Sequence, residues 1–149
     1  MFVCHGNICR SPMAEFVLKD MVKRRGLEKD FIISSSATST EEIYNGIGNP
    51  VYPPAKDILE AHCINPSGKR AVQLKESDYD KYDLFIGMDS ANIRNMTHIL
   101  CGDKDNKIRK LMEYKGSSAD VSDPWYTRDF DRCYKDIYSG CEALLNFLI

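Results

Sequence analysis

The chain has 149 residues, of which 43% are hydrophobic and 28% charged, and a net charge of −2 at pH 7. This length fits a single domain over residues 1–149, with a core large enough to need no disulfide staples. The weak charge gives no electrostatic reason to expect nucleic acid or an anionic membrane as a partner. No apolar run is long enough to span a bilayer, and we expect no secretion signal at the N-terminus. Six irregularly spaced cysteines favour reduced thiols and a cytoplasmic setting.

Short apolar runs alternate with segments of helical periodicity along the chain. A long loop with several glycines and prolines is expected over 40–54. Because buried strands that alternate with helices form a parallel sheet covered on both faces, the pattern predicts an α/β fold. Strands are predicted at 1–3, 31–33, 84–88 and 108–112, and helices at 12–25, 55–62, 90–100 and 129–148.

The segment VCHGNICRSP at 3–12 lies between the first predicted strand and the first predicted helix. Ligands of a parallel sheet bind beyond the carboxyl ends of its strands. Gly6 and Asn7 tolerate unusual backbone angles, so the chain can curl with its N–H groups inward against the helix N-terminus and cradle an anion. Arg10 adds a planar fork that can grip two phosphate oxygens. We therefore predict a phosphate-binding loop formed by His5, Gly6, Asn7, Ile8, Cys9 and Ser11.

The same cradle favours the thiolate form of Cys4, which makes this residue a candidate nucleophile. A helix dipole supplies less than about 2 kcal/mol, so loop N–H groups, Arg10 and a hydroxyl such as that of Ser11 must supply the rest. Asp123, fixed by the following Pro124, is a candidate proton donor for the leaving oxygen. A phosphocysteine intermediate and water attack, with Asp123 as the base, would follow. No metal or cofactor is required, because Arg10 and the cradle neutralise the phosphate charge.

At these residues the sequence resembles the low-molecular-weight protein-tyrosine phosphatases. The resemblance extends over the chain through VCHGNICRSP, Ser-Ala-Thr-Ser at 36–39, Gly-Asn-Pro at 48–50, Gly-Met-Asp-Ser at 87–90 and Asp-Pro-Trp-Tyr at 123–126. It implies a doubly wound four-stranded parallel sheet with helices on both faces. It also implies that Cys4 is the nucleophile, that Arg10 binds the phosphoryl oxygens, and that Asp123 is the general acid.

The resemblance also implies supporting residues behind the loop. Asn7 and Ser11 match the family's loop-shaping asparagine and thiolate-stabilising serine, and Ser35 matches the serine that holds the asparagine. Two positions depart from the family pattern, because Lys69 and Val72 stand where a histidine and an arginine are expected. At these two positions, the resemblance therefore does not assign the side chains that support the loop from behind.

Other interpretations of the two thiols in the loop remain. Cys4 and Cys9 could be buried packing thiols, a redox pair, or metal ligands together with His5. Arsenate reductases resemble this chain in fold and loop, but they use two further cysteines close together in a mobile segment. A phosphate-binding sensor without turnover is another reading, against which the presence of both Cys4 and Asp123 argues. By resemblance to the phosphatases, Cys9 could also capture an oxidised Cys4 as a disulfide.

The other four cysteines are expected to be packing thiols. Cys133 and Cys141 lie on the apolar stripe of the last predicted helix. Cys63 and Cys101 are isolated from each other and from the opening loop. None of them forms the pair that an arsenate reductase needs.

Bulky side chains are expected to wall the phosphate cradle into a deep slot: Ile8 from the loop, Tyr44 from the long loop, and Trp125 and Tyr126 beside the acid. A phosphotyrosine ring can fill such a slot and let phosphorus reach Cys4, whereas phosphoserine is too short. The arginine-phosphatase branch of the family resembles this loop but carries a threonine where Ile8 stands. We therefore predict a phosphotyrosine-containing protein or peptide as the substrate, in preference to phosphoarginine and phosphoserine.

Overall fold

The computed structural model describes residues 1–149 and contains a four-stranded parallel sheet in the order β2-β1-β5-β6. Phe2 in β1 lies opposite Ser35 in β2 and opposite Ile86 in β5. The chain thus places later strands on both sides of β1, which confirms the predicted doubly wound sheet. In such sheets the ligand binds at the carboxyl end of the strand where the order reverses. The strands are β1 (Phe2–Cys4), β2 (Ser35–Ala37), β5 (Phe85–Gly87) and β6 (Ile108–Lys110).

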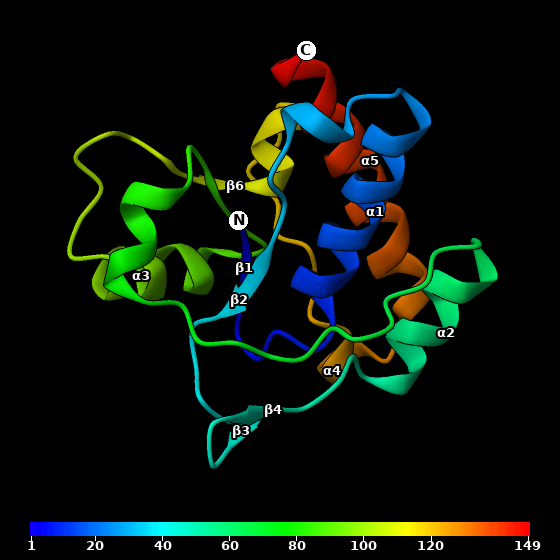
Figure 1. The fold of residues 1–149 in the computed structure, drawn as a ribbon, viewed down its shortest axis with the longest axis horizontal. Helices are drawn as coiled ribbons and strands as arrows, with labels where there is room; N and C mark the ends of the chain where they lie inside the picture. The colour runs from blue at the N-terminus through cyan, green and yellow to red at the C-terminus, as the bar shows by residue number, and fades with distance from the viewer.

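Helices cover both faces of this sheet, as predicted (Figure 1). Helices α1, α2 and α5 pack together on one face, whereas α3 packs on β5 and β6 from the other. The short helix α4 lies at the end of the sheet where β1 leads into α1. The helices are α1 (Arg10–Arg24), α2 (Pro53–Ala61), α3 (Ser90–Ile99), α4 (Pro124–Thr127) and α5 (Phe130–Leu148), with 3₁₀ helices at Glu28–Asp30, Glu76–Lys81 and Leu111–Lys115.

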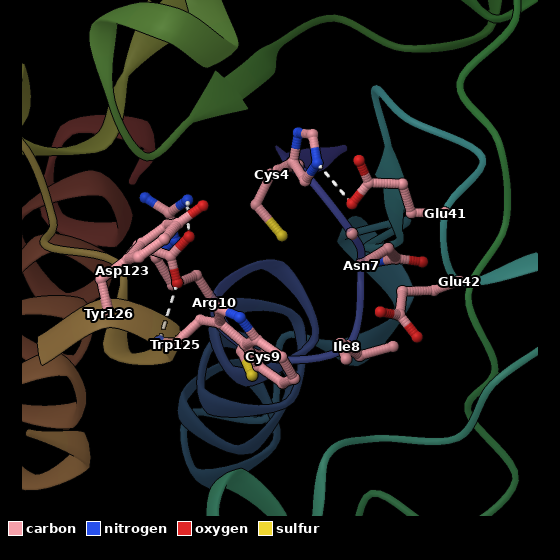
Figure 2. Close-up of a pocket in the computed structure, with 12 residues that line it drawn as sticks. Cys4, Asn7, Ile8, Cys9, Arg10, Glu41, Glu42, Asp123, Trp125 and Tyr126 are labelled. Carbon is pink, nitrogen blue, oxygen red and sulfur yellow. Dashed lines mark hydrogen bonds and ion pairs between the residues drawn. The ribbon is translucent and has the colours of Figure 1, made fainter. Parts of the chain in front are cut away.

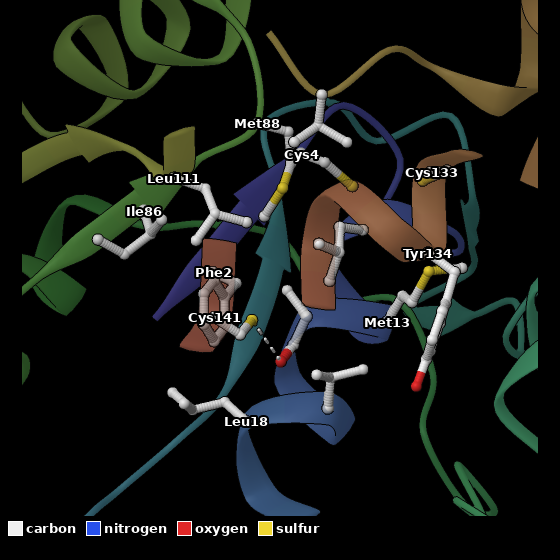
Figure 3. Packing of buried hydrophobic residues seen from close by; sticks show 14 of the residues in the cluster. Phe2, Cys4, Met13, Leu18, Ile86, Met88, Leu111, Cys133, Tyr134 and Cys141 are labelled. Carbon is white, nitrogen blue, oxygen red and sulfur yellow. Dashed lines mark hydrogen bonds between the residues drawn. The ribbon is translucent and has the colours of Figure 1, made fainter. Parts of the chain in front are cut away.

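The main core lies between the sheet and the pair α1 and α5 (Figure 3). Met13, Val17 and Met21 of α1 and Ile137 and Leu144 of α5 are buried there at the spacing that the sequence predicts. A fully buried side chain of this kind stabilises the fold by about 1.5–3 kcal/mol. A smaller cluster fills the space under α3. Helix α1 is therefore held firmly, and the loop before it is anchored at both ends.

The strand predicted at 31–33 is wrong. Strand β2 begins only at Ser35, and Ile32 is 84% exposed. The hydroxyl of Ser35 donates to Glu15, and that of Ser36 to the sulfur of Met1. Polar side chains with such partners can be buried in a central sheet, so this strand carries no apolar signal.

The predicted loop over 40–54 contains a hairpin of β3 (Ile43–Tyr44) and β4 (Ile47–Gly48). Its turn residues Asn45 and Gly46 both have positive φ angles, 51° and 78°. This is the backbone of the two-residue turn that an Asn-Gly pair favours. The sequence therefore held a hairpin signal that the loop prediction did not use.

Several element boundaries also differ from the predictions by one or two residues, and two of them serve as examples. Helix α1 begins at Arg10, two residues before the predicted start. Strand β6 ends at Lys110, and the rest of the predicted strand begins a 3₁₀ helix. Both differences lie at element ends, where side-chain periodicity carries little information.

The six cysteines fall into two groups by burial. Cys133 and Cys141 are buried in the core, as predicted, but Cys63 and Cys101 are exposed. Each exposed cysteine follows a helix end with a left-handed backbone, at φ 61° and 59°. That position after a helix end projects away from the core, which explains why the packing prediction fails there.

The structure has no helix that combines the length and the hydrophobicity needed to cross a membrane.

Candidate active site

The loop from Cys4 to Arg10 connects β1 to α1 at the carboxyl end of the sheet. Of the two residues expected to take unusual backbone angles, only Asn7 does so, with φ at 60°. Gly6 serves a different purpose. A Cβ atom at Gly6 would lie 3.2 Å from Cγ of Glu42, so the glycine lets the opposite wall approach the loop.

The buried side chain of Asn7 holds the loop in shape. Its Nδ2 donates to Oγ of Ser11 over 2.8 Å and to Oγ of Ser35 over 2.9 Å. Its Oδ1 accepts from the backbone N–H of Val72 over 3.0 Å. Val72, one of the two departures from the family pattern, thus supports the loop through its main chain. The amide has no free donor left, which fixes its orientation.

The thiol of Cys4 is buried and faces two donors. Oγ of Ser11 lies 3.0 Å from Sγ of Cys4, and the backbone N–H of Ser11 lies 3.4 Å from the same sulfur. Because this Oγ already accepts from Asn7, its own hydrogen is available for the sulfur. Donors to sulfur and the N-terminus of α1 both favour the thiolate. Ser11 therefore lies where the sequence predicts a thiolate-stabilising hydroxyl.

A buried polar chain supports Asn7 from behind. Ser35 accepts from Asn7 and donates to Oε1 of Glu15 over 2.6 Å. Glu15 is bonded to Lys19, and its Oε1 lies 3.7 Å from Nζ of Lys69. Lys69 also donates to the carbonyl of Ser35 over 3.0 Å. Burial lowers the pKa of Lys69, and the carboxylate of Glu15 opposes that shift.

The guanidinium of Arg10 is almost fully buried and bonded to three acceptors. Its Nη1 donates to Oδ2 of Asp89 over 2.7 Å and to the carbonyl of Val121 over 2.9 Å. Its Nη2 lies 3.4 Å from Oδ2 of Asp123. Burial disfavours its charge, but Cys4, Asp89 and Asp123 outweigh burial and raise the pKa of Arg10. The fork is therefore always charged and fixed in direction.

Asp89 has two roles at the end of β5. Its Oδ1 accepts from the backbone N–H of Asn92 over 2.8 Å and caps α3. Its other oxygen holds Arg10, a role that the sequence analysis missed. The only signal for it was the Gly-Met-Asp-Ser motif after a predicted strand, because that strand end faces the same edge of the sheet as the loop.

Asp123 lies across the loop from Cys4 at the start of α4 (Figure 2). Its Oδ1 accepts from the backbone N–H of Trp125 over 3.0 Å, and Pro124 is the first residue of the helix. Its side chain is 27% exposed, so it faces the cavity rather than the core. The long contact with Arg10 is the weakest of those that hold it.

A cavity of about 320 Å³ opens above the thiol. This volume lies at the lower end of the range for small-molecule sites. All the loop residues predicted from the sequence line it except Ser11, which lies beneath Cys4. The lining residues are Cys4, His5, Gly6, Asn7, Ile8, Cys9, Arg10, Glu41, Glu42, Asp123, Trp125 and Tyr126.

The prediction that Tyr44 walls the cavity is wrong. Tyr44 lies beside the hairpin turn, is 66% exposed, and does not line the cavity. A hairpin tip projects from the body of the protein, and the wall is formed by Glu41 and Glu42 just before it. Oε2 of Glu41 lies 2.9 Å from Nε2 of His5, and Oε2 of Glu42 accepts from Asn49 over 2.8 Å. The sequence analysis missed both carboxylates.

The second thiol of the loop, that of Cys9, is buried among apolar side chains. Burial, followed by the neighbouring Cys4, raises the pKa of Cys9. Burial likewise raises the pKa of Cys133 to about 12. Of these thiols, Cys4 is the one with hydrogen-bond donors directed at its sulfur from Ser11.

The cavity lies where the strand order of the parallel sheet reverses, and a thiol, a guanidinium and a carboxyl group face it. Together these groups can hold a phosphoryl group and break its ester bond. The fold and the site together thus define the class of cysteine-dependent phosphatases.

Comparison with known proteins narrows this class. Residues 1–148 match the family described as low molecular weight phosphotyrosine protein phosphatase. The low molecular weight protein-tyrosine-phosphatase YfkJ of Bacillus subtilis (strain 168) is 37% identical over 147 residues, which are 97% of this chain and 92% of YfkJ. The chain belongs to this family, and the predicted resemblance is confirmed.

Solved structures of relatives agree with the fold over nearly the whole chain. The crystal structure of YfkJ matches with a TM-score of 0.92 and 36% identity over 99% of this chain and 91% of that chain. SP-PTP from Streptococcus pyogenes matches with a TM-score of 0.86 and 40% identity over 99% and 91%. The Drosophila arginine phosphatase DARP matches with a TM-score of 0.87 and 26% identity over 99% and 95%. The fold is therefore shared by relatives named for two different substrates.

Proposed function

We propose that this protein hydrolyses phosphotyrosine in proteins or peptides through a phosphocysteine intermediate. The observation that carries the proposal is the thiol of Cys4, which lies 3.0 Å from the Ser11 hydroxyl and faces a cavity that Arg10 and Asp123 also line. Membership in a family of protein-tyrosine phosphatases supports the same activity.

In the first step, the thiolate of Cys4 attacks phosphorus opposite the tyrosine oxygen. An S–P bond forms and the P–O bond to tyrosine breaks. Arg10 binds two of the non-bridging oxygens, and the loop N–H groups take up the remaining charge. The carboxyl group of Asp123 gives its proton to the leaving phenolate, which departs as neutral tyrosine.

In the second step, water hydrolyses the phosphocysteine. Asp123, now a carboxylate, takes a proton from the attacking water as the S–P bond breaks. The electron pair returns to the sulfur of Cys4, where Ser11 stabilises the thiolate, and inorganic phosphate leaves. Each group therefore returns to its starting state without a cofactor in the cycle.

The walls of the cavity support an aromatic substrate. Ile8 lies on one side, and Trp125 and Tyr126 lie beside Asp123 on the other. Trp125 is held by Tyr52, with ring centroids 5.2 Å apart, so part of the wall is pre-formed. Ring contacts add roughly 0.5–1.5 kcal/mol each for a phosphotyrosine. The methyl groups of Ile8 disfavour a guanidinium, which argues against phosphoarginine.

The proposal includes one domain over residues 1–149 and a cytoplasmic setting. The family match over residues 1–148 supports the single domain. Six free cysteines, two of them exposed, favour a reducing compartment.

The test compares phosphotyrosine, phosphoarginine and phosphoserine peptides of one sequence by kcat/KM, beside arsenate reduction with thioredoxin. We expect the highest value with phosphotyrosine and no arsenate reduction. The Cys4→Ser variant is the matched control, since it should bind phosphate or tungstate without turnover. Preference for phosphoarginine, or turnover by Cys4→Ser, would overturn the proposal.

A further inference from the structure

The segment that carries Asp123 has irregular backbone from residue 117 to residue 123. Two contacts hold the Asp123 carboxyl itself, at 3.4 Å from Arg10 and 3.0 Å from the N–H of Trp125. The first is long and uses the same guanidinium that a phosphoryl group would occupy. Helix α4, which the second contact caps, has only four residues. The position of the carboxyl must therefore depend on how the preceding segment is fixed.

One anchor of this segment is Val121, which is completely buried. Its N–H donates to the carbonyl of Met88 over 2.8 Å, and its carbonyl accepts from Arg10 over 2.9 Å. This anchor connects the segment to the end of β5. It leaves the residues before Val121 to be held by something else.

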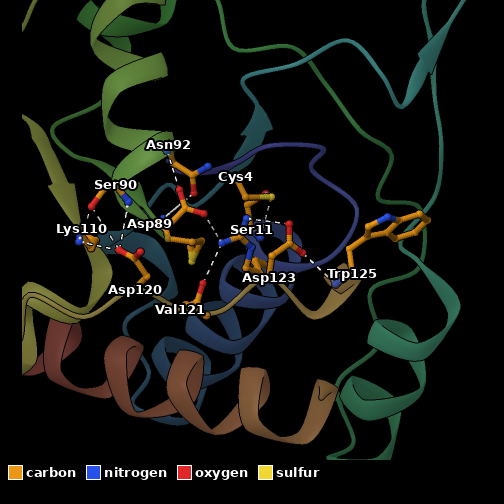
Figure 4. A network of polar contacts seen from close by, with 12 residues as sticks. Cys4, Ser11, Asp89, Ser90, Asn92, Lys110, Asp120, Val121, Asp123 and Trp125 are labelled. Carbon is orange, nitrogen blue, oxygen red and sulfur yellow. Dashed lines mark hydrogen bonds and ion pairs between the residues drawn. The ribbon is translucent and has the colours of Figure 1, made fainter. Parts of the chain in front are cut away.

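The second anchor is the ammonium group of Lys110 (Figure 4). Its Nζ donates to Oδ1 of Asp120 over 2.8 Å, to the carbonyl of Ser118 over 2.9 Å and to Oγ of Ser90 over 3.0 Å. An ammonium has three N–H donors, and all three are used here. Oδ1 of Asp120 also accepts from the N–H of Ser90 over 3.2 Å. The end of β6, the start of α3 and the segment before Asp123 therefore meet at one charged group.

The ammonium group of this anchor is largely buried and therefore needs its partners. The side chain of Lys110 is 11% exposed, and a buried ammonium is costly unless it is paired and hydrogen-bonded. The hydrogen bond from Lys110 lowers the pKa of Asp120 and so favours its carboxylate form. Lys110 does not line the cavity, so any influence on the reaction passes through the groups that it holds.

We propose that Lys110 is a positioning residue for the phosphatase reaction. Through Asp120 and the carbonyl of Ser118, it holds the segment that precedes Asp123. Asp123 therefore stays within reach of the leaving oxygen when Arg10 binds a phosphoryl group instead of the Asp123 carboxyl. This inference rests on the proposed function, in which Asp123 is the proton donor. Misplacement by about 1 Å is enough to cost a large part of a proton donor's contribution.

The test is the Lys110→Met variant, which keeps the length of the side chain and removes its donors. Its kcat/KM is measured on aryl phosphates from nitrophenyl phosphate, whose leaving group needs little protonation, to phenyl phosphate, whose leaving group is about as basic as tyrosine. We expect a loss of about tenfold with phenyl phosphate and below about twofold with nitrophenyl phosphate. If Lys110 contributed to stability alone, kcat/KM would fall by the same factor on all substrates. That result would overturn the inference.

Lys115→Met is the matched control. Lys115 lies five residues away, is exposed, and donates to Oγ of Ser139 over 3.1 Å, outside the segment. This variant should leave the dependence on the leaving group unchanged. Lys110→Arg, which keeps the charge and several donors, should recover most of the loss with phenyl phosphate. If Lys110→Met does not fold, Asp120→Ala gives the same comparison, because it removes the acceptor of Lys110 and its side chain is half exposed.

The Asp123→Asn variant separates this inference from the proposed function. If Asp123→Asn loses equal activity on good and poor leaving groups, the proton-donor role fails and the inference with it. If Asp123→Asn loses more activity on poor leaving groups than on good ones and Lys110→Met does not, the inference alone fails. In the double variant, Lys110→Met should add no further selectivity, because the group that it positions is already gone.

Discussion

The floor and the rim of the cavity differ in how their side chains are held. Cys4, Asn7 and Arg10 of the floor are at most 3% exposed, and hydrogen bonds join them to β2, to the cap of α3 and to the segment before α4. At the rim, Trp125 is 46% and Tyr126 82% exposed. The floor has one arrangement set by its partners, whereas the rim side chains are more exposed, and of the two Trp125 packs against Tyr52.

This difference separates the rate of the reaction, which depends on the floor, from the choice of substrate, which depends on the rim. Substitutions in the floor should change the rate of the reaction on every substrate, because they alter groups that every phosphoryl group contacts. Substitutions at the rim should change the ranking of substrates and leave the chemistry in place. Variants in each region test that separation.

Arg10→Lys tests the floor most severely. Lysine keeps the charge but lacks the planar fork that reaches Asp89 and Val121 and still faces the phosphate. We expect kcat/KM to fall by about 10²–10³-fold on all substrates, as for loss of a preorganised transition-state donor. Arg24→Lys, on the same helix but exposed, should stay near the parent rate. A selective effect of Arg10→Lys on one substrate class would break the separation of floor and rim.

Ser35→Ala tests the support beneath the floor. The change leaves a donor of Asn7 unpaired and removes a partner of Glu15, both buried. We expect the free energy of unfolding to fall by about 1–3 kcal/mol in denaturant titration. The adjacent Ser34→Ala is the control, because Oγ of Ser34 is buried without a partner, and its loss should cost little. Equal losses in the two variants would mean that the buried chain adds nothing to stability.

The floor could be predicted from the sequence because its main residues are neighbours in the chain. VCHGNICRSP places the thiol, the fork and the serine within one loop, so local backbone geometry decides most of the arrangement. The sheet could be predicted because apolar runs mark β1 and β5. Strand β2 could not, because its buried Ser35 depends on Asn7 and Glu15, which lie far away in the sequence.

The rim depends on contacts that the sequence does not display. Glu41 and Glu42 face the cavity because the hairpin after them packs at Gly48, where a Cβ atom would lie 1.9 Å from the carbonyl oxygen of Ala71. That close approach orients the hairpin and directs Tyr44 away from the site. The error at Tyr44 thus came from tertiary packing rather than from residue type.

Ile8→Thr tests a wall residue that belongs to the loop. The threonine hydroxyl can solvate a guanidinium where the methyl groups of Ile8 cannot. We expect the ratio of kcat/KM for phosphoarginine to that for phosphotyrosine to rise by about tenfold, equivalent to about 1.4 kcal/mol. Side-by-side rates on peptides of one sequence measure this ratio. An equal fall in both rates would place Ile8 with the floor instead.

Glu41→Gln tests the outer rim and should have the smallest effect. The carboxylates of Glu41 and Glu42 give this wall a negative charge, which His5 offsets only when protonated. Peptides with lysine or arginine beside phosphotyrosine should therefore be hydrolysed faster than peptides with glutamate there. Exposed charge pairs contribute about 0.2–1 kcal/mol, so Glu41→Gln should reduce this preference by a factor between about 1.4 and 5. The preference should also weaken as salt is raised.

Glu28→Gln makes the same change of charge at the far end of the sheet and should leave the preference intact. If the two variants behave alike, net charge rather than the rim selects the substrate.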